Sequence, residues 1–411
     1  MKVVFLTWGE TPRSYGVFGS QAIAQFVASK RQMGDGSEFS FISALPIVHS
    51  GFVREKLNFF KELTKVKHQL ENIPFSIIPI YTTQNFVNSS KTTLGLMHIG
   101  AHWHLKRKLQ SIKPDIVHCR SYHAAWAALS VRKKYKFNYK IVFDARALWP
   151  EEIALKKRWK VNDENYVFLK SLECELLLSS DATVAVSDPM TEHFLDLSNQ
   201  RVETIYNSTS AKNLGNSVKG INKKNTTLCY VGALANNSWH EPILLLELYL
   251  KFRECVTNPR LLIVTTSSHK KLLKDFSVLS TEELTITSSK SIDELTRLLS
   301  TADYGALPYR KASVGYEELL AKAVLATKTV EYLASGLPVL VNKQCEGAAS
   351  IITKYDLGIA YDPLNLAAID AVALNKYKND EISKNAKKLA HDLFDYEANA
   401  KRYCDLYTSL L

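Results

Sequence analysis

One stretch of the chain combines a charged pair with the signals that turn a helix into a strand. Lys328 and Glu331 are three residues apart, which places them on roughly the same face of a helix. Gly336 fits the left-handed cap of that helix, and Pro338 prevents the helix from continuing. The apolar run at 339–341 is typical of a buried parallel strand. Ligands of open α/β sheets bind at such junctions, so Glu331 is the first candidate site residue.

Further polar side chains follow apolar segments in the first half of the chain. His118 is expected at the end of a strand, with Arg120 and His123 on the loop that follows it. Gly16 and Gly19 would let the backbone approach a phosphate or an acceptor. An ordinary strand–helix connection explains the two glycines equally well.

A second polar group follows the apolar run at 140–143. Arg146 with Glu151 and Glu152 is a candidate polar cluster for an acceptor, and a structural ion pair is the alternative. His98 and His102 have the helical spacing of two zinc ligands, but no third ligand or catalytic glutamate accompanies them. We therefore expect no metal site.

Length and composition predict a soluble protein of two domains. The chain has 411 residues, 46% of them hydrophobic and 23% charged, which is ordinary for globular proteins. Its six cysteines are scattered, as expected for free thiols in a reducing compartment. No apolar run is long enough to span a membrane, and the N-terminus does not resemble a signal peptide. We expect a cytoplasmic protein.

The net charge of +11 fits anionic substrates, an anionic membrane surface or nucleic acid. Nucleic acid is the least favoured partner, since no recognition-helix pattern or aromatic–basic motif is present. A solvated basic surface is the plain alternative. Peripheral contact with an anionic membrane would use a basic set in the first half, formed by Lys56, Lys61, Lys65, Lys67, Lys106, Arg107 and Lys108.

Short apolar strands alternate with helical patterns along the whole chain, which predicts parallel sheets wound by crossover helices. The expected strands are 3–6, 39–42, 75–78, 116–118, 140–143, 182–186, 228–231, 261–264, 284–286, 304–307 and 339–341. A polar segment at 207–217, continuing to residue 225, is the expected linker. The predicted architecture is two Rossmann-like doubly wound domains, residues 1–210 and 215–389, with a C-terminal helix at about 390–411 that returns to the first domain.

Several motifs resemble the retaining GT-B glycosyltransferases of the sucrose-synthase/mannosyltransferase-like family, also called glycosyl transferases group 1. The resemblance covers nearly the whole chain. It is carried by the glycine segment 15–22, the strand with histidine at 114–118, the segment 180–187, the asparagine turn at 205–207, the start of the second domain at 230–232 and the block 331–339.

This resemblance implies a nucleoside-diphosphate sugar bound by the second domain and a glycan or lipid-linked acceptor bound by the first. It also implies transfer with retention of configuration, with no metal and no cofactor. The Lys- and Asn-rich composition with tyrosine-rich segments suits surface polysaccharide synthesis in a bacterium. No Asp-x-Asp pair is present, so basic side chains and helix N-termini would neutralise the diphosphate.

The resemblance also assigns roles to individual residues. Glu331 would accept hydrogen bonds from the donor ribose, and Lys328 would meet a phosphate or pair with Glu331. His118 and Arg146 are the expected catalytic residues. The remaining donor-site candidates are Thr329, Pro308, Tyr309, Arg310, Lys311, Gly232 and His240, and Gly16, Gly19, Arg120, His123 and Glu151 are the candidates for the acceptor or phosphate loop.

Two positions depart from the family pattern. Ala323 stands where many members carry a second glutamate, and Ala233 stands where they carry a diphosphate-binding arginine. Arg310, Lys311 or His240 would then have to supply the missing charge. Because of these departures, a nucleotide-sugar 2-epimerase of the same fold and a catalytically inactive nucleotide-sugar-binding regulator remain alternatives to the glycosyltransferase.

Overall fold

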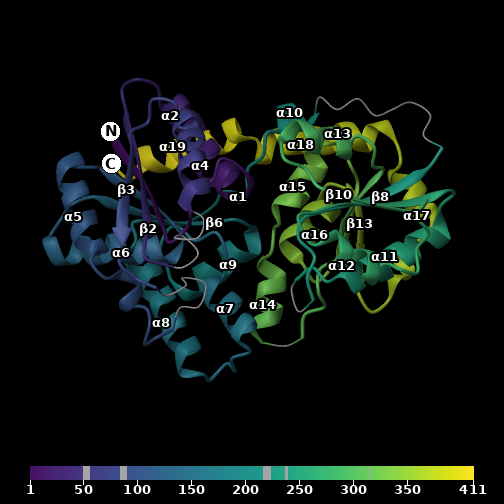
Figure 1. Ribbon diagram of the computed structural model, residues 1–411, viewed down its shortest axis with the longest axis horizontal. Coiled ribbons are helices and arrows are strands. Elements are labelled where there is room, and N and C mark those ends of the chain that lie inside the picture. The colour runs from purple at the N-terminus through teal and green to yellow at the C-terminus, as the bar shows by residue number, and fades with distance from the viewer. Residues whose placement is uncertain (50–55, 84–89, 216–223, 237–238, 314) are drawn as a thin grey trace. The chain divides into compact units, whose positions relative to one another are not determined.

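The computed structural model describes residues 1–49, 56–83, 90–215, 224–236, 239–313 and 315–411. The chain divides into two compact units. Unit 1 contains Met1–Tyr206, Gly315–Ala323 and Asn399–Leu411, and unit 2 contains Asn207–Val314 and Val324–Ala398. Each unit has a parallel sheet with helices on both faces (Figure 1), so the predicted fold of two Rossmann-like domains is confirmed.

Unit 1 is built on a parallel sheet whose strand order in the described residues is β3-β2-β1-β4-β5-β6-β7. Its strands are β1 (Lys2–Trp8), β2 (Glu38–Pro46), β3 (Phe75–Ile80), β4 (Ile116–Arg120), β5 (Lys140–Asp144), β6 (Ala182–Ala185) and β7 (Val202–Thr204). Its helices are α1 (Gly16–Phe18), the π-helical turn η1 (Gly19–Ala24), α2 (Gln25–Met33), α4 (Lys56–Gln69), η3 (Leu96–His98), α5 (Ala101–Ile112), α6 (Ser121–Tyr135), α7 (Trp149–Lys157), α8 (Glu164–Ser179), α9 (Asp188–Leu197), α14 (Tyr316–Ala323) and most of α19 (Tyr396–Ser409).

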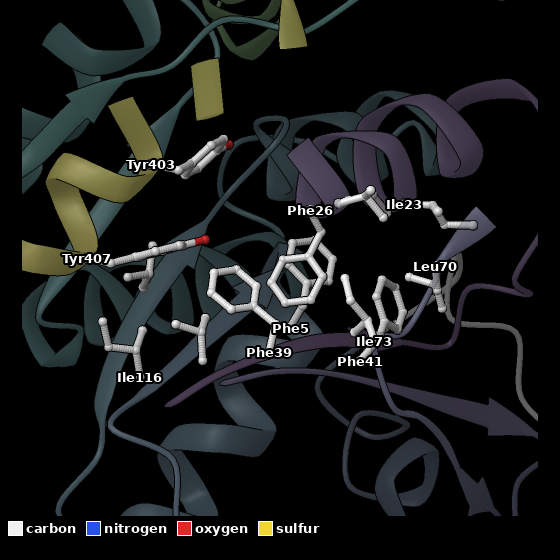
Figure 2. Close-up of a cluster of buried hydrophobic side chains, with 14 of the residues drawn as sticks. Phe5, Ile23, Phe26, Phe39, Phe41, Leu70, Ile73, Ile116, Tyr403 and Tyr407 are labelled. Carbon is white, nitrogen blue, oxygen red and sulfur yellow. The ribbon is translucent and has the colours of Figure 1, made fainter. Parts of the chain in front are cut away.

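Aromatic and aliphatic side chains together form a core of unit 1 (Figure 2). The Phe5 ring lies 4.9 Å from the ring of Phe26 and 5.1 Å from that of Phe41, measured between centroids. Tyr403 and Tyr407 of α19 are buried in the same cluster. The last helix therefore contributes to the core of unit 1, although the sheet of unit 1 ends about 190 residues earlier in the sequence.

Unit 2 has a parallel sheet in the order β10-β9-β8-β11-β12-β13 across its described residues. Its strands are β8 (Thr226–Val231), β9 (Pro259–Val264), β10 (Leu284–Thr287), β11 (Tyr304–Leu307), β12 (Val339–Asn342) and β13 (Gly358–Tyr361). Its helices are α10 (Ala211–Gly215), α11 (Pro242–Cys255), α12 (His269–Asp275), α13 (Ile292–Leu299), α15 (Thr327–Ala334), α16 (Glu346–Lys354), η4 (Leu366–Ala368), α17 (Ala371–Tyr377) and α18 (Asp380–Phe394).

The strand predictions agree with the structure at every expected position, whereas β7 and β13 were not predicted. The expected linker is only partly a linker. Its described part forms α10, where Leu214 is buried and the Ala211 amide donates to the carboxylate of Asp395 at 3.0 Å. The part at 216–223 lies outside the described residues.

Helix α14 belongs to unit 1, although its sequence lies between segments of unit 2. The rings of Tyr166 and Tyr316 are 5.8 Å apart, and the Ser187 hydroxyl donates to the carbonyl of Ala323 at 2.6 Å. Simple division of the sequence near residue 215 therefore misplaces this helix, because its partners are side chains of the first half.

The strand orders locate the two places where ligands of such sheets bind. The order reverses between β1 and β4 in unit 1 and between β8 and β11 in unit 2. Positive φ angles occur just after three strands near these points. After β4, φ is 70° at Ser121; after β5, it is 65° at Arg146; after β8, it is 127° at Gly232. Such angles in non-glycine residues cost about 1–3 kcal/mol and concentrate at functional sites.

Gly305 of β11 provides a test of how the fold positions α15. A Cβ atom at this glycine would lie 2.4 Å from ring atoms of Tyr332, a residue of α15. We expect Gly305→Ala to lower the free energy of unfolding by about 1–3 kcal/mol because the ring must move. Denaturant unfolding measures this effect. Gly36→Ala, which meets no atom within 4 Å, is the control and should change stability by less than about 0.5 kcal/mol. Equal stability of the two variants would contradict the packing argument.

Candidate functional site

The most confined charged group of unit 2 lies at the reversal point between β8 and β11. Lys328 of α15 donates a hydrogen bond from Nζ to the hydroxyl of Tyr230 at 2.9 Å. Its ammonium also lies 4.4 Å from the centroid of the Tyr230 ring. A Cβ atom on Gly232 would be 3.1 Å from Nζ, so a side chain at this position would crowd the ammonium. Gly232 therefore leaves the space that Lys328 occupies.

Burial shifts the protonation of both members of the predicted pair. Only 7% of Lys328 is exposed, and this burial lowers its pKa to about 7, although Glu331 opposes the change. Burial likewise raises the pKa of Glu331 to about 7, and Lys328 opposes that rise. The two groups therefore interact electrostatically, whereas the ammonium donates its hydrogen bond to Tyr230. Strongly shifted groups at a switch point are typical of functional sites.

Aromatic rings enclose this lysine. The ring of His240 lies 4.7 Å from that of Tyr309 and 5.9 Å from that of Tyr230, between centroids. Burial and then the charge of Lys328 lower the pKa of His240 well below its usual value. His240 is thus harder to protonate than a free imidazole while Lys328 beside it carries charge. Its expected contribution of positive charge to a diphosphate stays a prediction.

The loop after β11 lies beside His240, because it carries Tyr309. Pro308 and Tyr309 are buried, and Asn342 donates from its side chain to the carbonyl of Tyr309 at 3.1 Å. Burial raises the pKa of Tyr309, and the nearby hydroxyl of Thr329 opposes this rise. The structure therefore places Tyr309, Thr329 and Lys328 in one region of unit 2, and their role in binding a donor stays a prediction.

The two basic residues of that loop differ in their surroundings. The amide of Arg310 donates to the carbonyl of Trp239 at 2.8 Å, and its side chain is half-buried. Lys311 is exposed, and its charge acts on Asp362. Lys311 is consequently a surface residue, and Lys328 is the cation that lies closest to Gly232.

In unit 1, the structure corrects the position of His118. It lies in the middle of β4 and is buried. Its Nε2 lies 3.3 Å from a carboxylate oxygen of Asp144, and its Nδ1 lies 2.6 Å from the hydroxyl of Tyr407. Since a carboxylate only accepts, Nε2–H donates to Asp144, and Nδ1 shares a hydrogen bond with the hydroxyl of Tyr407. Both nitrogens are therefore used inside unit 1, and this placement gives no support to the predicted catalytic role.

Two arginines lie at the same edge of the sheet. Arg146 lies 3.5 Å from Asp144 and donates to the side chain of Gln21 at 3.1 Å. Arg120 is the last residue of β4, not part of a loop, and donates to Glu10 at 3.3 Å. Burial would raise the pKa of Asp144, but Arg146 and His118 outweigh it and hold this pKa below its usual value. The ends of β4 and β5 thus carry a compact cluster of charges.

Glu151 belongs to a different cluster from Arg146. Lys170 places its ammonium 2.8 Å from Glu151 and 3.4 Å from Nε2 of His193, and it also pairs with Glu173. Glu151, Glu173 and His193 have the arrangement of metal ligands, but the lysine ammonium already lies among them. Glu152 is exposed. The predicted cluster of Arg146, Glu151 and Glu152 is therefore wrong, because α7 turns Glu151 toward α8.

His123 forms part of a histidine chain that sequence spacing did not reveal. It lies in α6, not on a loop, and its Nδ1 is 2.8 Å from Nε2 of His98. Nδ1 of His98 is in turn 3.3 Å from Nε2 of His102. Burial lowers the pKa of His98 well below its usual value and that of His102 to about 4. Since both nitrogens of His98 face other imidazoles, no single ion can bind all three rings in this arrangement.

The glycine segment is helical from its first glycine. Gly16 begins α1 with φ of 65°, and Gly19 begins the π-helical turn η1. A Cβ atom on Gly19 would lie 2.7 Å from the carbonyl oxygen of Ser14. Close packing of the backbone therefore accounts for Gly19. The two glycines lie in the first helical turns after β1 and not in a loop before them.

The prediction of the site missed two tyrosines. Tyr230 accepts the hydrogen bond from Lys328, and the hydroxyl of Tyr332 accepts from the amide of Val231 at 2.8 Å and donates to the carbonyl of Ala306 at 3.3 Å. Tyr332 thereby joins β8, β11 and α15. Two signals for them are present in the sequence: Tyr230 stands in the otherwise apolar run 228–231, and Tyr332 stands beside Glu331.

Two protein-family models match parts of the chain. Residues 75–211 match the model described as Glycosyltransferase Family 4, and residues 215–391 match the model described as Glycosyl transferases group 1. No curated protein sequence gives a significant match. Among the described helices, none has the length and apolar character needed to cross a membrane.

Solved structures with the same fold include proteins of different activities. Sucrose-phosphate synthase from Thermosynechococcus elongatus is 14% identical, with a TM-score of 0.70, over 100% of this chain and 98% of that one. Anabaena HepE in complex with UDP is 13% identical, with a TM-score of 0.66, over 100% of both chains. A structure described as a UDP-N-acetylglucosamine 2-epimerase from Listeria monocytogenes is 13% identical, with a TM-score of 0.59, over 99% of this chain and 96% of that one. These likenesses establish the shared fold.

The pKa shifts of the buried pair predict how stability depends on pH. Between pH 7 and 10.5 the unfolded chain keeps the proton that folded Lys328 has lost, so this lysine makes stability rise with pH. Between pH 4.5 and 7 folded Glu331 keeps a proton that the unfolded chain has lost, so this glutamate makes stability fall.

We therefore expect the unfolding free energy of wild type, relative to that of Lys328→Met, to rise from pH 7 to about pH 10. Urea unfolding over this range measures it. The exposed Lys311→Met is the matched control and should give a constant difference. A constant difference for Lys328→Met as well would show that the lysine is not buried as described.

Proposed function

We propose that this chain is a group 1 glycosyltransferase that transfers a sugar from a nucleoside diphosphate to a glycan or lipid-linked acceptor with retention of configuration. Two glycosyltransferase models, which match residues 75–211 and 215–391, support this proposal. One observation carries the proposal. Lys328 and Glu331 lie at the reversal point of the unit 2 sheet, with the ammonium directly against Gly232. This is where open α/β sheets bind nucleotides.

Lys328 is the best substitute for the arginine that Ala233 replaces. A neutral or weakly charged amine in a buried site becomes a full cation when a diphosphate enters, because the anion stabilises the ammonium. Gly232 allows the diphosphate oxygens to approach the backbone as well as this ammonium. Charge on the leaving diphosphate would then be neutralised by the protein itself, and we expect no metal to be required.

Glu331 would bind the ribose of the donor. An ionised carboxylate offers two oxygens to two neighbouring hydroxyls, which suits a ribose. Its pKa of about 7 means that ionisation and ribose binding are coupled near neutral pH. The base of the donor would lie against the loop after β11, which carries Pro308 and Tyr309. HepE, which shares the fold, has been solved with UDP and with UDP-glucose, and this makes UDP the first ligand to test.

Two alternatives to glycosyl transfer have specific support. A structure described as a 2-epimerase shares the fold, and such an enzyme would convert the donor without an acceptor. A nucleotide-sugar-binding regulator would explain Ala323 and Ala233, which lack the side chains of the fuller family pattern. Incubation with UDP-sugars alone separates these cases, since an epimerase yields an epimer and a regulator yields no product.

The donor assignment predicts stabilisation by nucleotide. We expect UDP or another nucleoside diphosphate to raise the melting temperature, because a ligand at 100 times its Kd adds about 2.7 kcal/mol of stability. Glu331→Ala should remove most of this gain by deleting the ribose acceptor. Glu254→Ala, an exposed carboxylate of α11, is the control and should respond like wild type. Equal stabilisation of Glu331→Ala would exclude the ribose assignment.

The role of Lys328 predicts proton uptake on binding. At about pH 8 its amine is mostly neutral in the free protein, and a bound diphosphate raises its pKa, so binding should draw a proton from the buffer. Calorimetry in two buffers of different ionisation enthalpy measures this proton. We expect Lys328→Met to abolish the uptake and to weaken UDP binding about 10- to 150-fold, as for a lost charged hydrogen bond.

The control for this measurement is Lys311→Met, which should retain both the uptake and the affinity. Proton uptake that persists in Lys328→Met would assign the proton to another group and contradict the proposed diphosphate contact.

A further inference from the structure

A long segment of unit 1 contains no acidic residue. From Asn72 to Pro114 the chain has neither Asp nor Glu, and it carries the cations Lys91, Lys106, Arg107, Lys108 and Lys113. This segment includes β3, η3 and α5. A segment with cations and no acids attracts anionic partners, and this attraction is strongest where the cations are exposed.

Large apolar side chains are exposed within the same segment. Tyr81, Leu96, Ile99 and Trp103 each expose between 46% and 50% of their surface. Scattered apolar residues on a surface are ordinary, but a contiguous group of them marks an interaction site. We call these four residues together with Arg107 the Trp103 patch.

Close contacts connect Tyr81, Ile99 and Trp103 directly or through His104, and Leu96 lies three residues before Ile99 in the chain. The amide of Tyr81 donates to the carbonyl of Ile99 at 3.4 Å, and a Cβ atom on Gly100 would touch the ring of Tyr81. The ring of His104 lies 6.1 Å from Tyr81 and 4.9 Å from Trp103. The patch therefore continues from the end of β3 across η3 into α5.

Helix α5 keeps its two faces distinct. Ala101, Leu105 and Leu109 are buried against unit 1. On the other face Trp103 and Arg107 are exposed, and the Arg107 guanidinium lies 4.8 Å from the centroid of the Trp103 ring. An amphipathic tryptophan beside cations on long apolar stems is the arrangement of protein surfaces that lie at a lipid headgroup layer.

We propose that the Trp103 patch docks unit 1 onto a membrane surface that carries anionic lipids. The tryptophan and the apolar side chains would enter the headgroup region, while Arg107 and Lys108 would contact the lipid phosphates. This proposal does not depend on the assignment of the donor site. A protein partner with an acidic surface is less well matched, because such a partner would use the cations and would leave the exposed tryptophan, tyrosine and aliphatic side chains without an apolar environment.

The structure also narrows the basic set expected from the sequence. Lys65 of α4 pairs with Glu62 at 2.7 Å, so its charge is partly neutralised, and the side chain of Lys56 lies outside the described residues. Arg107 and Lys108 are exposed on α5, within the segment that has no acids. The membrane contact is therefore assigned to α5, whose cations lie in a segment without acids, whereas α4 carries Glu62 among its lysines.

Sedimentation with vesicles tests the proposal on the full-length protein. We expect binding to vesicles of equal parts phosphatidylcholine and phosphatidylglycerol, and little binding to phosphatidylcholine alone. The double variant Arg107→Gln/Lys108→Gln should lower partitioning about 25-fold, since each cation near an anionic surface contributes about fivefold. Trp103→Ala should lower it about tenfold or more, because roughly 100 Å² of apolar ring surface no longer leaves water.

Matched controls lie on α12 of unit 2. Leu273→Ala removes a side chain that is 57% exposed, and Lys274→Gln removes a cation beside it. Both controls should bind vesicles like wild type, and unchanged melting temperatures should show that all variants fold. Absence of wild-type binding to the anionic vesicles, or unaltered binding of Trp103→Ala, would overturn the proposal. Equal binding of wild type and Trp103→Ala to soluble polyglutamate is expected, because that contact needs charge alone.

The same preparations separate this proposal from the donor assignment. Trp103→Ala should keep its stabilisation by UDP, and Glu331→Ala should keep its vesicle binding. Loss of vesicle binding in Glu331→Ala would contradict the location of the membrane contact on the Trp103 patch.

Discussion

The candidate donor site depends on the space that Gly232 leaves for the ammonium of Lys328. A buried ammonium is costly, and here it is stabilised by one hydroxyl, one aromatic face and a nearby carboxylate. These contacts offset only part of the cost of burial, so the pKa of Lys328 is about 7. A bound diphosphate would raise this pKa and favour the charged ammonium. Tyr332 holds this arrangement by joining β8, β11 and α15 through its hydroxyl.

Unit 1 uses its buried polar groups differently. His118 joins Asp144 of β5 to Tyr407 of α19, and Lys170 joins Glu151 of α7 to α8 and α9. These contacts are satisfied within the unit and stabilise the positions of its helices. The left-handed backbone at Ser121 and Arg146, just after β4 and β5, marks the part of unit 1 where an acceptor is most naturally expected.

Local patterns in the sequence predicted the elements well, because apolar runs and glycine caps act over a few residues. The helix carrying Glu331, its cap at Gly336 and the strand after it are all observed. Contacts between distant residues were not predictable in this way. Nothing in the spacing of Lys328 reveals that its partner is Tyr230, and nothing near Glu151 reveals Lys170. The same limit explains why the sequence did not reveal the burial of His118, since its partner Tyr407 comes from the last helix of the chain.

Amide hydrogen exchange with and without UDP tests the central claim most directly, because it locates a bound nucleotide without any variant. We predict slower exchange in the residues that follow β8, in the loop after β11 and in the first turn of α15, where Gly232, Tyr309 and Lys328 lie. Unchanged exchange in these three segments at saturating UDP, or protection confined to unit 1, would contradict the assignment of the donor site to Lys328 and Glu331.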